Sequence, residues 1–118
     1  MSGSTVPDVS TSMRDLHWSP REKAVARRAF DHALHRELEG TIQEAKGRAA
    51  KVKEPSDLWD LEQWLTRRRK EIDDKYDYRY SVLPFVFAVL IREGGVSLED
   101  LRELGEDKLD FIRGILRL

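Results

Sequence analysis

Two histidines have the spacing of metal ligands. His32 and His35 are three residues apart, which places them on one side of a helix, and Asp31 and Glu37 are nearby. A catalytic zinc takes three protein ligands, but the sequence holds no third cluster to complete such a site, and His17 is isolated. We therefore interpret the histidines as exposed polar residues and predict no metal site.

Three aspartates farther along the chain are a weaker indication of a metal site. Asp73, Asp74 and Asp77 are close enough in sequence to suggest a calcium loop, but the glycine and the terminal glutamate of such a loop are missing. Ser81 has no neighbouring histidine or lysine in the arrangement of a nucleophile and its base, and the chain has no cysteine. We predict no catalytic residue, no cofactor and a protein that is not an enzyme.

The last chemical candidate is a basic run, Arg67 to Lys70. Such a run can contact phosphates, so a nucleic-acid-binding helical protein is one alternative. The chain as a whole is not basic, because 21 basic and 22 acidic side chains give a formal net charge of -1. Acidic residues close to the run favour a solvated face, and we expect no nucleic-acid partner.

The elements that position these residues are predicted to be helices. Ser19 fits the N-cap of a first helix, with Pro20 at its first position and Glu22 completing a capping box. Apolar residues then recur at steps of three and four, which places them on one face. The helix continues through residue 52, and Pro55 stops it.

Four more helical segments follow. A second long helix is predicted to begin near Ser56, which is a plausible N-cap. Residues 82–91 are apolar almost all round, as in a helix that is buried on most sides, and Gly94 helps to end it. Residues 97–104 and 106–116 are predicted to form short helices. No run shows the alternation of an exposed strand, so we predict an all-α fold.

Composition divides the chain into a tail and one domain. Residues 1–17 are polar, with little to bury, and we expect a disordered N-terminal tail. Residues 18–118 form a single all-α domain, with long dimerising helices over 18–77 and a small helical head over 78–118. No signal peptide is recognisable, and no apolar run approaches the roughly 20 residues that span a bilayer. We expect a cytoplasmic protein without membrane insertion.

Helix length predicts an assembly. A single helix over residues 20–52 spans about 50 Å at 1.5 Å per residue, whereas a compact domain of this size has a radius of gyration of roughly 13 Å. Its apolar stripe therefore needs a second chain, and two copies related by a two-fold axis provide it. We predict an elongated antiparallel homodimer. Trp59 lies off the leucine stripe of the second helix, and the pattern alone leaves it between core and interface.

The sequence from residue 57 to residue 95 resembles the fluorescence recovery protein family. The resemblance rests on Asp57-Leu58-Trp59-Asp60-Leu61, Arg69-Lys70-Glu71-Ile72-Asp73, Lys75-Tyr76-Asp77-Tyr78-Arg79 and Phe85-Val86-Phe87-Ala88 leading to Glu93-Gly94. It implies an α-helical homodimer that needs no cofactor. It also implies a task, which is to bind the photoactivated orange carotenoid protein and hasten its return to the resting orange state. That return ends non-photochemical quenching of the phycobilisome.

The resemblance also assigns roles to residues. It places Trp59, Glu62, Gln63 and Arg69 in the dimer interface, and Phe85 and Lys108 in contact with the partner. Trp59 and Arg69 match the tryptophan and arginine of the family's interface. Glu62 and Gln63 stand where the family commonly has a His-Asp pair, so the ion pair with Arg69 cannot form in the same way. The alternative is a related helical dimer with a different protein partner, in an organism that lacks phycobilisomes.

Overall fold

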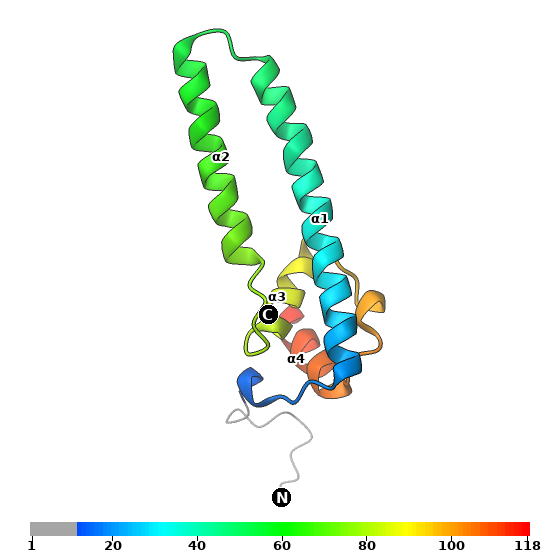
Figure 1. The fold of residues 1–118 in the computed structure, drawn as a ribbon. Coiled ribbons are helices and arrows are strands. Elements are labelled where there is room, and N and C mark those ends of the chain that lie inside the picture. Colours follow the sequence, from blue (N-terminus) through cyan, green and yellow to red (C-terminus); the bar gives the residue numbers. More distant parts are fainter. Residues whose placement is uncertain (1–11) are drawn as a thin grey trace, which may run out of the picture.

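The computed structural model describes residues 12–118 as an elongated arrangement of helices measuring 68 × 25 × 20 Å (Figure 1). The helices are α1 Pro20–Ala50, α2 Pro55–Lys75, α3 Leu83–Arg92 and α4 Glu106–Leu116, with 3₁₀ turns at Met13–Asp15 and Glu99–Leu101. No strand occurs in this part of the chain. The predicted all-α fold class is confirmed.

The first helix begins as the sequence predicts. The backbone N–H of Glu22 donates to the Ser19 hydroxyl at 3.1 Å, and the backbone N–H of Ser19 donates to the Glu22 carboxylate at 2.9 Å. This reciprocal pair satisfies two donors at the start of the helix. Helix α1 then runs through Gly40 and Gly47 without a break and ends at Ala50.

The predicted start of the second helix is wrong. Pro55, which we expected only to stop the preceding helix, is the first residue of α2, and Glu54 rather than Ser56 is its N-cap. A proline at the first helical position loses no hydrogen bond, since its missing N–H would have had no partner there. Asp57 closes the turn by accepting the backbone N–H groups of Lys53 at 3.1 Å and Glu54 at 3.0 Å.

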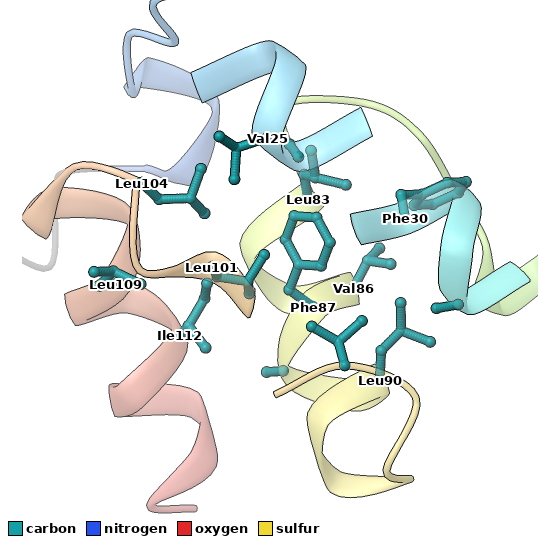
Figure 2. Packing of buried hydrophobic residues seen from close by; sticks show 14 of the residues in the cluster. Val25, Phe30, Leu83, Val86, Phe87, Leu90, Leu101, Leu104, Leu109 and Ile112 are labelled. Atoms are coloured by element: carbon teal, nitrogen blue, oxygen red, sulfur yellow. The ribbon is translucent and has the colours of Figure 1, made fainter. Parts of the chain in front are cut away.

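The helices form two regions that pack differently. Residues 35–75 form the hairpin, in which the second part of α1 and all of α2 run antiparallel (Figure 1). Residues 16–34 and 76–118 form the head, which holds the hydrophobic core. Figure 2 shows side chains of α3 at the centre of this core, with Phe87 between residues of α1 and α4. Phe87, Leu83, Leu90, Leu101 and Ile112 are fully buried.

The boundaries of the head differ from the expected division at residue 77. Val25, Ala26, Phe30 and Ala33 of α1 are buried in the core, because the first half of that helix covers one side of α3 (Figure 2). Most of the expected disordered tail lies outside the described residues. Its last part, residues 12–17, instead forms a capped 3₁₀ turn and packs Leu16 against the core.

The end of α3 provides a test of backbone strain. Gly94 has a φ of 83°, and a Cβ there would meet no other atom within 4 Å. A Gly94→Ala variant should lose about 1 kcal/mol of unfolding free energy, because only the backbone conformation penalises the methyl group. Urea denaturation at fixed protein concentration measures this. Gly40→Ala is the matched control, since Gly40 has equal space but lies in a helix, and it should gain about 0.5–1 kcal/mol.

Candidate functional site

Large apolar side chains are exposed along the hairpin. They are Leu38, Ile42, Leu58, Trp59 and Leu65, each at least 42% exposed. The leucine stripe of α2, with Leu58 and Leu65, is therefore open in the single chain, and of that helix only Trp64 and Ile72 are buried. Apolar residues gathered on an exposed face mark an interaction surface.

The contact between the two helices of the hairpin is largely polar, which explains why the leucines remain exposed. The Trp64 ring lies between the guanidinium groups of Arg48 and Arg68, at 4.5 Å and 5.0 Å from the ring centroid. Arg68 also pairs with Glu44 on α1 at 3.3 Å. These cations cover the tryptophan and leave the apolar stripe of α2 without a cover in the same chain.

The four residues expected in the dimer interface all lie exposed on α2. Trp59 is 62% exposed, the largest value among the apolar residues of the hairpin. The Thr66 hydroxyl donates to Glu62 at 3.0 Å, and Arg69 pairs with Asp73 at 3.7 Å. Steps of three and four residues from Trp59 place these side chains on the part of α2 that faces away from Trp64. The structure thus brings the interface candidates together on one open side of the hairpin.

Phe85 is the exposed apolar residue of α3. It is 50% exposed, while Leu83, Val86 and Phe87 around it are buried. Phe85 lines a groove between α2 and α3, where the hairpin joins the head. Its placement is compatible with the expected contact to a partner.

Lys108 is not at the surface, although we expected it to contact the partner. It is 3% exposed, and its ammonium donates to Glu22 at 3.0 Å and to the His17 carbonyl. The Glu22 carboxylate also accepts the backbone N–H of Gly105. The lysine therefore joins the start of α1 to the start of α4 inside the head, and another protein could reach it only after the head rearranged.

These bonds fix the charge state of Glu22. Burial by itself raises the pKa of the carboxyl, but hydrogen bonds from the backbone N–H groups of Ser19 and Gly105 and from Lys108 lower it to about 2. Glu22 and Lys108 are therefore a charged pair at neutral pH.

A second polar cluster, which the sequence analysis missed, connects the hairpin to the head. Lys75 at the end of α2 pairs with Glu37 of α1 at 2.7 Å and with Glu93 after α3 at 2.6 Å. The Tyr76 hydroxyl donates to Glu37 at 2.8 Å. The cluster was missed because its members are far apart in sequence, and the family-like Lys-Tyr-Asp-Tyr-Arg segment was the one signal for it.

Burial and charge act in opposite directions on this cluster. Burial raises the pKa of Glu37. The hydrogen bonds from Lys75 and Tyr76 lower it by a larger amount, so the net pKa lies below its usual value. Burial likewise lowers the pKa of Lys75, and its two carboxylate partners raise it to a net value above normal. Glu37 and Lys75 are therefore both ionised at neutral pH, and their contacts join α1, α2 and the end of α3.

Aromatic rings fasten the rest of the same segment to α1. Phe30 meets Tyr76 and Tyr78 edge to face, with ring centroids 5.4 Å and 4.8 Å apart. Tyr80 continues the row to Trp18 at 5.3 Å. Edge-to-face pairs of this kind add to the burial of the rings, so the segment between α2 and α3 sets how the hairpin leaves the head.

The residues that suggested metal or nucleic-acid chemistry have ordinary surface roles. His32 and His35 are exposed, and no group of acidic or histidine residues in the described part of the chain could hold a metal. In the basic run, Lys70 pairs with Asp74 at 2.9 Å and Arg68 with Glu44 and Glu71. Three of the four cations of the run, Arg68, Arg69 and Lys70, pair with acids on the same hairpin, which is typical of a solvated face.

Comparisons with known proteins agree with the resemblance in the sequence. A family model described as "Photoprotection regulator fluorescence recovery protein" matches residues 18–115. The fluorescence recovery protein of Synechocystis sp. (strain PCC 6803) is 42% identical over 101 residues, which is 86% of this chain and 93% of that protein. The solved structure of the Fremyella diplosiphon protein of the same name is 44% identical with a TM-score of 0.80, and that of the Synechocystis protein is 41% identical with the same score. Each alignment covers 86% of this chain and 100% of the other.

Proposed function

The chain belongs to the fluorescence recovery protein family, and we propose on that basis that it binds the photoactivated orange carotenoid protein and accelerates its return to the resting orange state. As a member of this family it is a non-catalytic photoprotection regulator. The observation that carries the proposal is the match over residues 18–115, which includes both the hairpin and the head. We further propose that it acts in the cytoplasm and needs no cofactor.

The proposed mechanism is a shift in a conformational equilibrium. A protein that binds one state, or the path between two states, more tightly than the others changes their populations or rates. Binding to an opened carotenoid protein, with Phe85 among the contacts, holds its separated domains near each other. That proximity raises their effective concentration and favours reclosure.

We propose that the active form is a homodimer of hairpins. The exposed apolar side chains of α1 and α2, with Trp59 beside them, need a cover that a single chain does not supply. A second copy related by a two-fold axis presents the same surface in return. Glu62, Gln63 and Arg69 then lie at or near the contact, where Arg69 can exchange its weak pair with Asp73 for a pair across the interface.

The experiment that tests the function follows the carotenoid protein directly. Purified orange carotenoid protein is photoactivated, mixed with this protein, and followed by absorbance from red to orange in the dark. Acceleration at low stoichiometry supports the proposal. A folded protein that leaves the recovery rate unchanged contradicts it.

One observation favours a second candidate. Glu62 and Gln63 replace the His-Asp pair that the family commonly has at these positions, which is compatible with the same fold serving another protein partner where phycobilisomes are absent. Affinity capture from the native organism, followed by identification of the bound protein, separates the two candidates. Capture of an orange carotenoid protein supports the first candidate. Specific capture of a different protein, without an orange carotenoid protein, supports the second.

A single side chain tests the partner contact. Phe85→Ala should weaken binding by about 1–2 kcal/mol, or about five- to thirtyfold, because exposed aromatic residues are frequent anchors of interfaces. The measurement is the protein concentration needed for half-maximal acceleration of recovery. Leu98→Ala is the matched control, because Leu98 is an exposed apolar residue of the head outside the groove. Equal activity of the Phe85 variant and the wild type would show that Phe85 does not contribute to the partner contact.

A further inference from the structure

A groove at the junction of hairpin and head has the chemistry of a peptide-binding site. It lies between the C-terminal part of α2 and α3, with a volume of about 830 Å³. Its apolar lining consists of Val82, Phe85, Val86 and Val89. The half-exposed ring of Phe85 makes this lining accessible from outside the head.

The walls of the groove are acidic. Its lining includes five carboxylates and two basic side chains, namely Glu37, Glu71, Asp74, Asp77 and Glu93, with Arg68 and Lys75. Both cations are already occupied, since Lys75 is held by Glu37 and Glu93 and Arg68 pairs with Glu44 and Glu71. The groove therefore has an excess of negative charge around an apolar floor.

The carboxylates at the outer edge are the ones that can change partners. Asp74 pairs with Lys70 through two exposed side chains, and the exposed carboxylate of Glu71 meets Arg68 at 3.4 Å. Single contacts of exposed carboxylates are weak in water. Asp77 differs, because the Arg79 guanidinium binds both of its oxygens. A cation from another protein can therefore replace the partners of Glu71 and Asp74 without breaking the buried contacts of the head.

We propose that this groove binds an amphipathic segment of the partner protein, whose apolar side packs on Phe85 and the valines and whose lysine or arginine residues meet Glu71 and Asp74. Complementary charge together with an apolar floor is how a groove selects an amphipathic segment. The inference rests on the proposed function only in naming the carotenoid protein as the source of that segment.

The groove is separate from the leucine stripe of the hairpin. Leu65 and Asp74 are nine residues apart, which is about two and a half turns of an α-helix. The two side chains therefore project from opposite sides of α2. A contact confined to the leucine stripe therefore leaves Asp74 uncovered.

The first part of the experiment uses a probe whose chemistry is known. A synthetic peptide of about five helical turns, with one leucine face flanked by lysines, is titrated into the isotope-labelled full chain and followed by NMR. Its counterpart has glutamates in place of the lysines. We expect the lysine peptide to shift the amide signals of residues 82–89 and the glutamate peptide to leave them in place. Equal binding of both peptides, or shifts elsewhere only, overturns the proposal.

The second part removes charge without changing size. Glu71→Gln combined with Asp74→Asn should weaken binding of the lysine peptide about tenfold and reduce its salt dependence, because rim charges steer association. Glu99→Gln combined with Asp110→Asn is the control, since these acids are exposed on the head outside the groove. The wild type and the two double variants are also compared in the recovery assay with the carotenoid protein.

The two parts distinguish the failure of this inference from the failure of the proposed function. Suppose that the wild type accelerates recovery, that both peptides bind equally, and that the charge variants behave like the wild type. The proposed function then stands, and the groove is not the docking site. If the lysine peptide binds in the groove but the carotenoid protein is unaffected, the groove chemistry stands and the segment belongs to another protein.

Discussion

Replacing Trp59 with glutamate should give a folded monomer. Trp59 is 62% exposed in the single chain, so its loss removes little from the packing of one copy. In the proposed dimer it is a central aromatic anchor, and losing such an anchor costs about 2–4 kcal/mol, which raises the dissociation constant about thirtyfold or more. Light scattering coupled to size exclusion should change from twice the chain mass to the chain mass of 13.8 kDa.

Phe85→Glu is the matched control for this change. It introduces the same charge at an exposed aromatic residue, but in the head rather than on the hairpin. We expect it to remain a dimer while losing partner binding, whereas Trp59→Glu loses the dimer. Circular dichroism should report equal helix content for both. A Trp59 variant that stays dimeric at low micromolar concentration would place the interface elsewhere on the molecule.

Replacing Lys108 with methionine should destabilise the head strongly. The change keeps the length of the side chain but leaves the buried carboxylate of Glu22 without its cation. Breaking a buried ion pair by removing one member costs about 3–5 kcal/mol, since the remaining charge is uncompensated. Urea denaturation at neutral pH measures the loss, with wild type and variant at one protein concentration because dimerisation contributes to stability.

Lys70→Met controls for the chemistry of the substitution. Lys70 pairs with Asp74 at a similar distance, but both side chains are exposed. A pair in water is worth about 0–1 kcal/mol, so this variant should stay close to the wild type. Equal effects of the two substitutions would show that burial of Lys108 has no energetic importance.

The pH dependence of the Lys108 variant gives an independent check. Because the pKa of Glu22 is lowered from 4.5 to about 2 in the folded chain, its contribution to stability is complete above pH 4.5 and is lost as the pH falls towards 2. In Lys108→Met the carboxyl can protonate at a higher pH, which removes the buried charge. The difference in unfolding free energy between the two proteins should therefore shrink between pH 7 and pH 3.

Much of the local structure could be read from the sequence. The capping box at Ser19 and the glycine that follows α3 depend on groups within a few residues of each other. Such interactions form wherever the same local sequence occurs. The start of α2 was the exception, because Pro55 can end one helix or begin the next, and the residues around it allow both.

The roles of individual side chains in the head depended on tertiary structure. Lys108 is charged, which predicts a surface position, but its partner Glu22 is 86 residues away. Phe85 lies between buried residues of α3, and its own ring stays half exposed because Leu83 and Phe87 fill the space against α1 and α4.

The sequence by itself therefore determined that this is an all-α protein with two long helices and a family-like segment after them. Those features follow from periodicity, caps and local motifs, which act over three or four residues. Only the tertiary structure decided which charges are buried, which apolar residues stay exposed, and that an acidic groove forms between α2 and α3. Burial depends on which distant segments pack together, and no local pattern specifies that.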